Sequence, residues 1–338
     1  MQVNREEFLN QLEAVRPGLS PKDIIEQSSC FVFQDGTIYT YNDEMACSLE
    51  SEFVDFDGAV PSVPLINLLS KMKEDEVSIH ITPKTSKLVV KGKGRSAGIT
   101  LQKDILLPFD DAVDVPEDWS PVHKHLCTAI QVVASCASKN ASKFITTCVH
   151  CTPTHLEACD NYQMARYPMK TGMKGSFLVR SESLKSVAEA GVGEYCETKS
   201  WVHFRNERGL VVSCRLSRDE YPSLDDALVV KDGTSSTFPK GLGEAAERAE
   251  IFSSTNLNND QVLIDLKEDK LVIKAEGSSG WYKETKKVAY DGPDLSFYIP
   301  PKLLQDITKQ SVDVLITAER LKVETGRYQF VTVLGAPN

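Results

Sequence analysis

The chain has 338 residues, of which 41% are hydrophobic and 25% are charged, and its formal net charge is −10. This length suits two or three domains, each large enough for its own core. The acidic balance argues against a simple nucleic-acid coat, because phosphates repel an acidic surface. Apolar runs stay well short of the roughly 18 residues of a membrane helix, and residues 1–7 lack the apolar segment of a secretory signal. We therefore expect a cytosolic protein, whose nine cysteines are buried reduced thiols.

The predicted elements follow the same order in each third of the chain: a helix, an antiparallel meander, a second helix and a second meander. Apolar residues at helical spacing predict helices at 5–16, 65–72, 121–139, 183–190, 242–252 and 303–309. Branched and aromatic residues beside turn signals predict strands at 30–33, 37–41, 77–81, 88–90, 99–101, 144–150, 155–158, 201–204, 210–216, 262–266, 271–275, 314–317, 321–325 and 328–334. The segments 110–120 and 230–239 are acidic or rich in Gly, Ser and Pro, which predicts joints between domains 1–112, 118–230 and 236–338.

One pattern recurs in all three domains, at a spacing of about 120 residues that is typical of domains and not of solenoid repeats. In each copy a predicted strand runs directly into a predicted helix. The copies are VPSVPLINLL at 60–69, VRSESLKSV at 179–187 and IPPKLLQDI at 299–307. A chain built from three copies of one module indicates its architecture before it indicates any chemistry.

The predicted helices do not share the acidity of the chain. The segments 4–16, 62–73, 121–143, 180–190, 240–253 and 300–310 together carry a net charge of +4, which leaves −14 on the rest. The clearest case is 121–143, which holds three lysines and no acidic residue. This distribution is typical of a protein that meets a polyanion with its helices alone, although ordinary solvated helix faces would give similar counts.

Three short stretches now indicate a family. They are EACDNYQMAR at 157–166, FLVRS at 177–181 and LSRDEYP at 216–222, and the ending QFVTV at 329–333 accompanies them. The first is similar to the ATDGHRLA stretch in the middle domain of the bacterial DNA polymerase III beta sliding clamp family. The whole chain resembles that family, including a phage-encoded version of it. The resemblance implies an α+β fold of three repeated clamp domains, each with two helices packed on antiparallel sheets.

The resemblance also implies a function. Two chains would form a head-to-tail dimeric ring whose helices line a hole for double-stranded DNA. The ring would tether a DNA polymerase, would be opened by a clamp loader, and would catalyse nothing itself. Basic side chains would touch phosphates without reading sequence. The candidates that face DNA are Lys71, Lys73, Lys124, Lys139, Lys143, Arg248 and Lys302, with Arg5, Arg16 and Lys22 as weaker ones.

Family clamps bind short partner peptides in an apolar pocket between the second and third domains. The matching positions here are Cys159, Asn161, Tyr162, Gln163, Met164, Val331, Val333 and Leu334. Three of them depart from the family, since Asn161 replaces a glycine, Tyr162 a histidine and Gln163 an arginine. The ending LGAPN also differs from the family's Met-Pro-Met type. At the dimer interface the resemblance brings the strands near 95–101 and 282–290 together. Ile99 and Leu101 are expected near Ile251 and Phe252.

Other chemistries are weaker alternatives. Residues 148–159 contain a C-x2-C-x3-H-x3-C pattern, but its spacers are short for zinc and its first part alternates like a strand. A G-x-G-x-x-A pattern at 241–246 follows a polar segment, whereas a dinucleotide site needs a buried strand there. We find no nucleophile set and expect His80 and His203 to pack on sheets. We therefore assign no catalytic residue, metal or cofactor. A clamp-fold peptide scaffold that does not encircle DNA is the second hypothesis, and an enzyme with triplicated domains is the third.

Overall fold

The computed structural model describes residues 1–82, 84–115, 117–140, 142–253 and 260–337. They form two compact units. The first comprises Met1–Ser135, Thr147–Leu156 and Met169–Glu220, and the second comprises Cys136–Thr146, Glu157–Pro168 and Tyr221–Asn338. Pro116, in the first predicted joint, and Asn338, at the end of the tail, lie outside the described residues. The units are a division by spatial contact, and the three-domain division remains a prediction.

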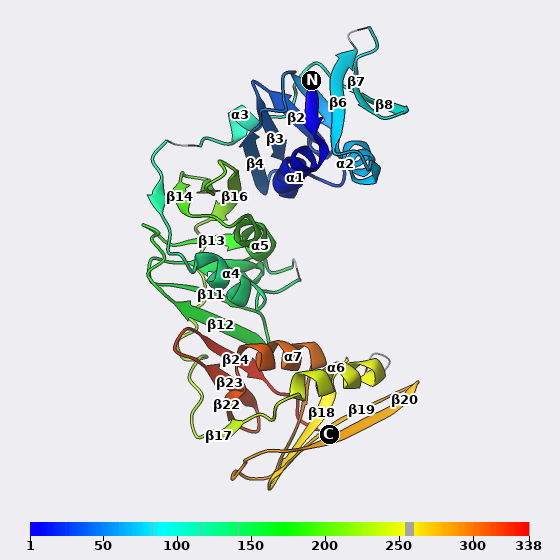
Figure 1. Cartoon of the computed structure of the whole chain (residues 1–338). Helices are drawn as coiled ribbons and strands as arrows, with labels where there is room; N and C mark the ends of the chain where they lie inside the picture. Colours follow the sequence, from blue (N-terminus) through cyan, green and yellow to red (C-terminus); the bar gives the residue numbers. More distant parts are fainter. Residues whose placement is uncertain (83, 116, 141, 254–259, 338) are drawn as a thin grey trace. The chain divides into compact units, whose positions relative to one another are not determined.

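Within the described residues, the same order of elements occurs three times: strand, helix, four strands, helix, three strands (Figure 1). The first copy is β1 (Gln2–Asn4), α1 (Arg5–Val15), β2 (Cys30–Gln34), β3 (Thr37–Tyr41), β4 (Met45–Glu50), β5 (Gly58–Pro61), α2 (Ser62–Lys71), β6 (Glu76–Thr82), β7 (Lys87–Gly92) and β8 (Arg95–Thr100). The second is β9 (Ser120–Pro121), α4 (Leu126–Ala134), β10 (Cys148–Cys151), β11 (His155–Cys159), β12 (Gln163–Pro168), β13 (Phe177–Arg180), α5 (Ser181–Ala190), β14 (Glu194–Glu197), β15 (Trp201–Arg205) and β16 (Val211–Ser217). The third is β17 (Thr234–Thr237), α6 (Leu242–Ser253), β18 (Val262–Lys267), β19 (Lys270–Gly277), β20 (Gly280–Lys287), β21 (Leu295–Ile299), α7 (Pro301–Gln310), β22 (Asp313–Ile316), β23 (Arg320–Glu324) and β24 (Gln329–Val333).

The repeated strand-to-helix pattern is confirmed at all three places. The strands β5, β13 and β21 lead directly into α2, α5 and α7. The N-cap residues Pro61, Arg180 and Pro300 share one extended conformation, with φ of −52°, −53° and −58° and ψ of 126°, 135° and 129°. A proline ring fixes φ in this range, which explains why two of the copies carry proline at this point.

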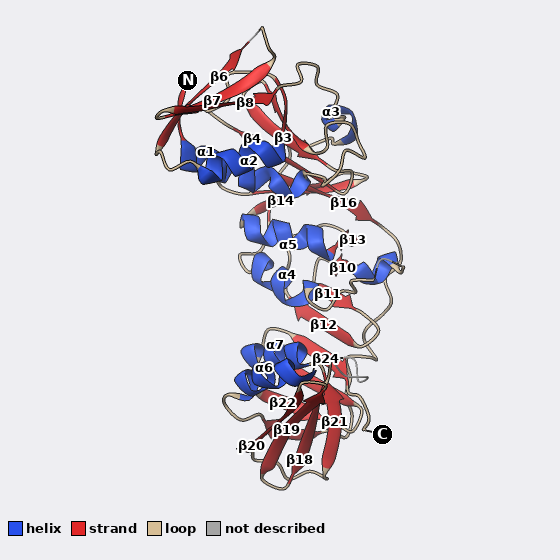
Figure 2. Ribbon diagram, turned by 90° about the vertical axis from the view of Figure 1, so that its right-hand side faces the viewer, coloured by secondary structure: helices blue, strands red, loops and turns tan. Residues whose placement is uncertain are grey.

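Each copy also pairs its two helices on a sheet. Helix α1 contacts α2, α4 contacts α5, and α6 contacts α7, as Figure 2 shows. The second helix of each pair buries apolar residues one turn apart, such as Leu65 with Leu69 and Leu304 with Ile307. This spacing places both side chains on one helix face, which is the amphipathic pattern of a surface helix. In α6, a Cβ on Gly243 would lie 2.7 Å from the Oγ1 of Thr308, so this glycine lets α6 and α7 approach closely.

The antiparallel sheets repeat the same pairings. Strand β1 pairs with β6, β9 with β14, and β17 with β22. In each copy the last three strands form a meander, β6-β7-β8, β14-β15-β16 and β22-β23-β24. Neighbouring copies join through one further pair of strands. Strand β16 pairs with β4 inside the first unit, and β24 pairs with β12 inside the second.

Four sequence predictions need correction. The helix predicted at 121–139 is only α4, Leu126–Ala134, because backbone groups beyond it bond outside a helix: Ser138 N–H donates to Thr146 O, and Asn140 N–H donates to the Ser138 hydroxyl. The strand predicted at 144–150 begins with a 3-10 turn, Phe144–Thr147, and is extended only from Cys148.

The two joints are also more structured than their composition predicts. The first contains the short helix α3 (Phe109–Ala112), and both Phe109 and Val113 pack in the core of the first unit beside Trp201. The second contains β17, a polar strand that pairs with β22 at the edge of the sheet. Of its four residues only Ser236 is buried. Composition failed here because short edge strands are stabilised by their partner strand and not by their own apolar content.

Candidate functional site

The stretch at 157–166 forms a tight turn between β11 and β12. The Asp160 carboxylate accepts hydrogen bonds from the backbone N–H groups of Tyr162, at 2.7 Å, and Gln163, at 2.8 Å. This is the local bonding that makes aspartate a good turn residue. The turn leaves the Tyr162 side chain 69% exposed, an unusual position for a large aromatic residue.

The C-terminal strand lies directly beside this turn. The register of β12 with β24 sets Gln163 opposite Thr332 and Met164 opposite Val331. Val333 N–H donates to the carbonyl oxygen of Tyr162 at 2.8 Å. Tyr162 and Val333, which is 45% exposed, are therefore neighbours on an apolar rim.

The other predicted pocket residues divide by burial. Cys159, Val331 and Leu334 are buried, Gln163 and Met164 are half-buried, and Asn161 is exposed. The structure thus brings together the residues that the sequence singled out, with some beneath the surface and some on it.

A groove of about 710 Å³ continues this rim. It is lined by Asp226, Val229, Val230, Lys231, Thr317, Ala318, Glu319 and Arg320. Arg320 lies opposite Val333 in the β23–β24 ladder, and Leu334 N–H donates to Glu319 O at 2.7 Å. Sequence reasoning missed these groove residues because Val230 and Lys231 fell in the predicted joint 230–239, and no local pattern linked the other residues to them. The apolar run Leu228–Val230 just before it, in which Val229 is 49% exposed, was the available signal.

Two of the stretches that carried the resemblance meet underneath this surface. The Tyr221 hydroxyl accepts a hydrogen bond from the Cys159 backbone N–H at 2.9 Å, and both residues are buried. The Arg166 guanidinium lies between Glu157, at 2.7 Å, and Asp225, at 2.6 Å. Glu157 is 3% exposed, so this ion pair fixes the strand beneath the rim and compensates a buried charge.

The tail after β24 is also held in place. Gly335 and Tyr298 exchange both backbone hydrogen bonds, at 2.9 Å and 2.8 Å, which attaches the tail to β21. The residues that follow Leu334 therefore run toward the sheet that contains β21.

The basic residues predicted to face DNA have different surroundings. Lys71, Lys73, Lys124, Lys139, Lys143, Lys302 and Lys22 are exposed. Lys71 and Lys302 lie on α2 and α7. Lys124 precedes α4 and Lys139 follows it, so their expected position on a helix is wrong, and Lys143 lies beyond both the predicted helix and α4. The shorter α4 is the reason.

The three arginines of that set already contact the protein itself. Arg5 donates to the carbonyl oxygens of Glu74, at 2.8 Å, and Leu69, at 3.3 Å, which satisfies the end of α2. Arg16 forms an exposed ion pair with Glu13. Arg248 bonds to Tyr282 at 2.9 Å and to Glu284 at 2.7 Å, and these bonds raise the Arg248 pKa. The Tyr282, Arg248 and Lys286 side chains lower the Glu284 pKa to about 2.

The residues predicted for the dimer interface divide in two. Ile99 and Leu101 are 8% and 3% exposed, so they belong to the core of the first unit. Ile251, in contrast, is 66% exposed on α6, and the Phe252 ring stacks on Tyr282 with centroids 6.2 Å apart. Trp281, at the start of β20, is 71% exposed.

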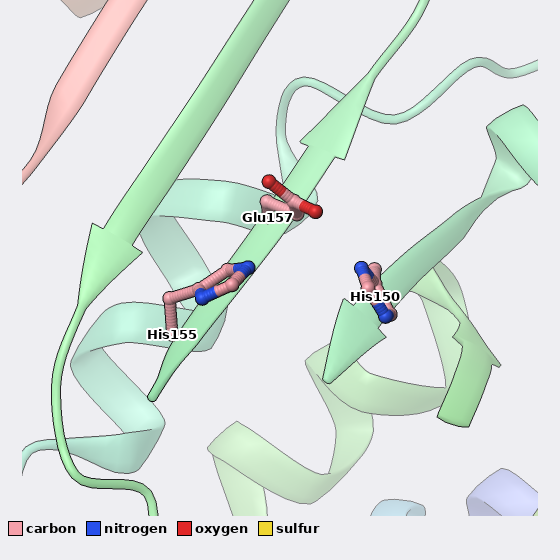
Figure 3. A group of neighbouring side chains, drawn as sticks. All are labelled: His150, His155 and Glu157. Carbon is pink, nitrogen blue, oxygen red and sulfur yellow. The ribbon is translucent and has the colours of Figure 1, made fainter. Parts of the chain in front are cut away.

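The cysteine-rich segment does not gather its cysteines into a metal centre among the described residues. Cys148, Cys151 and Cys159 are buried thiols outside any disulfide, and burial raises the pKa of Cys148 to about 11. The structure instead groups His155 with His150 and Glu157, whose donor atoms all lie within 4.8 Å of one another (Figure 3). His203 is buried in β15 opposite Ser213, which confirms that it packs on a sheet. Across the described residues, no helix is both long and apolar enough to cross a membrane.

Comparisons with known proteins give structural matches only. No protein-family model and no curated protein matches the sequence. Three solved structures of DNA polymerase III beta subunits align along the chain. The one from Thermotoga maritima is 14% identical, with a TM-score of 0.80, over 100% of this chain and 99% of that one. The one from Streptococcus pneumoniae is 19% identical, with a TM-score of 0.80, over 99% of both chains. The one from Pseudomonas aeruginosa is 15% identical, with a TM-score of 0.77, over 100% of both. Along its whole length, the chain has the fold of the DNA polymerase III beta subunit.

Proposed function

We propose that this chain is a DNA sliding clamp, a processivity factor that acts in the cytoplasm, or in the host cytoplasm if it is phage-encoded. Two copies would form a head-to-tail ring around double-stranded DNA and tether a DNA polymerase, and the chain itself would catalyse nothing. The observation that carries this proposal is the repeated joint between copies of the module. Strand β4 pairs with β16, and β12 pairs with β24. In both pairs the first residue of the receiving strand lies opposite the fourth residue of its partner, and an equivalent hydrogen bond precedes it.

The two joints can be compared atom by atom. Met45 and Gln163 are the first residues of β4 and β12, and they lie opposite Cys214 and Thr332. Just before each strand, Arg215 N–H donates to Glu44 O and Val333 N–H donates to Tyr162 O, both at 2.8 Å. In the third copy, β20 has the position that β4 and β12 have in the first two. In the first copy, β8 has the position that β16 and β24 have in the other two. A second chain whose β8 pairs with β20 would complete the series.

The register of this third joint follows from the meanders. Cys214 and Thr332 each lie at the end of a three-strand row. The matching rows are Glu197–Val202–Cys214, Ile316–Leu321–Thr332 and Ile79–Val90–Ala97. Gly280, the first residue of β20, would therefore lie opposite Ala97 of the second copy, and Trp281 opposite Ser96. Twofold symmetry makes the same contact twice, closes the ring and removes two exposed edges from each chain.

Phosphate contacts would come from exposed lysines that the protein leaves at its surface. Lys71 is the last residue of α2 and Lys302 is the second residue of α7, and both helices begin at a repeated strand-to-helix junction. Weak charge contacts of this kind are independent of sequence and weaken with salt, as a sliding protein requires. The exposed lysines Lys73, Lys124, Lys139, Lys143 and Lys22 are further candidates. Arg5, Arg16 and Arg248 would contribute less, because each already bonds to the protein.

Partners would bind at the rim formed by Tyr162 and Val333 and in the groove beside it. A linear peptide from the polymerase or the clamp loader suits such a site, since an exposed aromatic side chain provides a typical binding anchor beside a groove that presents Val229, Val230 and Ala318 among charged residues. The changed residues in the turn and the tail attached to Tyr298 indicate a peptide preference different from that of the family.

The test has two stages. Light scattering at several concentrations should give twice 37.4 kDa, and a persistent monomer would favour the peptide scaffold that does not encircle DNA. A dimer incubated with nicked circular DNA, with and without a cognate clamp loader, should then remain bound at high salt and leave when the DNA is cut once. Retention that is unaffected by linearisation would contradict a topological link. Reversing Lys71 and Lys302 to glutamate should flatten the salt dependence of binding by about one unit of slope per lysine, whereas K87E on β7 should not.

A further inference from the structure

We propose that the β10–β11 hairpin binds one divalent transition-metal ion of the Zn²⁺ class through His150, His155 and Glu157. His150 lies on β10, and the other two residues lie two positions apart on β11, so their side chains emerge on one face of that strand. Their donor atoms all lie within 4.8 Å of one another. Figure 3 shows the three side chains as neighbours, with His155 and Glu157 on one strand and His150 on the other.

The donor set suits this class of ion. Two imidazoles and one carboxylate are a common ligand set for Zn²⁺, and they also accept Co²⁺. The His150 and His155 rings are perpendicular, at 89°, with centroids 6.1 Å apart. Rings in this arrangement can each turn a nitrogen to a shared ion without stacking on each other. Small side-chain rotations would bring the donors to bonding distance.

The neighbours of His155 orient it as a ligand. The Thr152 hydroxyl donates its hydrogen to the His155 carbonyl oxygen at 2.9 Å, and its oxygen lies 3.1 Å from His155 Nδ1. The Thr154 hydroxyl lies at the same distance from that nitrogen. These two contacts hold the ring from its Nδ1 side. This is the outer-shell arrangement that fixes metal-binding histidines.

The charge around Glu157 also favours a cation. Arg166 donates from Nε at 2.8 Å and from Nη2 at 2.7 Å, and both bonds go to Oε2 of Glu157. The same guanidinium binds Asp225 at 2.6 Å, so one positive and two negative groups leave a net charge of −1 beside the two histidines. The positive charge of a divalent ion would be partly balanced by this net negative charge.

Calorimetric titration of chelator-treated, full-length protein with Zn²⁺ tests the assignment. We expect one ion per chain, bound at least about tenfold more weakly by H150A and by H155A. The matched control replaces His123 and His125, an exposed pair with ring centroids 5.4 Å apart, by alanine. The control should bind like the wild type. Equal affinity in all variants would overturn the proposal.

Co²⁺ provides a second test on the unaltered protein, which does not depend on whether the alanine variants fold. Coordination by histidine and carboxylate gives weak visible bands without the near-ultraviolet charge-transfer band of thiolate ligands. NMR should show paramagnetic broadening of the His150 and His155 ring signals, while those of His123 and His125 stay sharp. A thiolate band would instead assign the ion to Cys148, Cys151 and Cys159. That result, or sharp His150 and His155 signals, would refute the site.

Discussion

Val333 donates its backbone N–H to the carbonyl oxygen of Tyr162 at 2.8 Å, and this bond begins the pairing of the last strand with β12. The same bond, at the same length, joins Arg215 to Glu44 where the second copy of the module meets the first. Both joints inside the chain therefore have the same strand pairing and the same first hydrogen bond. Because Tyr162 also forms the rim of the proposed peptide site, one turn serves both assembly and binding.

The first prediction concerns the joint between two chains. In the register proposed above, the N–H of Trp281 would donate to Ser96 of a second copy, as the N–H of Ala46 is placed to do toward Ser213. Proline at position 281 removes that donor at the outer edge of β20. We expect W281P to be monomeric by light scattering at concentrations where the wild type is dimeric.

The control for this change keeps the donor and removes only the ring. W281T should retain the dimer, with weaker association because apolar area is lost. Circular dichroism should show that both variants keep the fold of the protomer. A dimeric W281P of unchanged stability would mean that the chains assemble through another surface.

The second prediction concerns the peptide site. Tyr162 is 69% exposed, so Y162A should leave the thermal midpoint nearly unchanged. It should weaken the binding of a polymerase-derived peptide about tenfold or more, as expected for an aromatic anchor. Fluorescence anisotropy with a labelled peptide measures the change. I24A, which removes an apolar side chain that is 86% exposed elsewhere, is the matched control. Equal losses in both variants would contradict a specific role for Tyr162.

The sequence predicted the repeated junctions because their signal is local. A proline or polar residue ends a strand and the next residues carry helical spacing, as at 60–69 and 299–307. It did not predict β4 or β12, whose extended form depends on partners far along the chain. The end of α4 was missed for a similar reason, since the bond from Ser138 N–H to Thr146 O competes with the helix and has no local signal.

Prediction of the candidate sites was uneven. The resemblance identified Tyr162 and Val333. Charge and spacing did not identify the groove residues Val229 and Arg320, because the groove forms only when β23 pairs with β24 and sets Arg320 opposite Val333. The cysteine spacing at 148–159 lies in the hairpin that carries the proposed metal site, but its cysteines are not the proposed ligands. Which face of a strand a side chain takes depends on register, and register put His150 rather than a cysteine beside His155.

The last prediction concerns pH and His203. This ring is fully buried, its Nδ1 lies 2.8 Å from the Ser213 hydroxyl, and its Nε2 has no hydrogen-bond partner among the described residues. Burial lowers its pKa from 6.5 to about 4. The unfolded chain therefore binds a proton in this interval that the folded chain does not. Stability should be complete above pH 6.5 and fall by about 3 kcal/mol as the pH drops to 4.

Urea denaturation at pH values between 7 and 4 measures this loss for His203. In H203Q the side chain stays neutral and can still bond to Ser213, so the part of the slope due to His203 should disappear. H125Q removes an exposed histidine and should keep the wild-type slope. If H203Q loses stability with acid as steeply as the wild type does, other groups control the acid sensitivity. A flatter profile in H203Q alone would identify the buried imidazole as the group that destabilises the β15–β16 sheet when it must accept a proton.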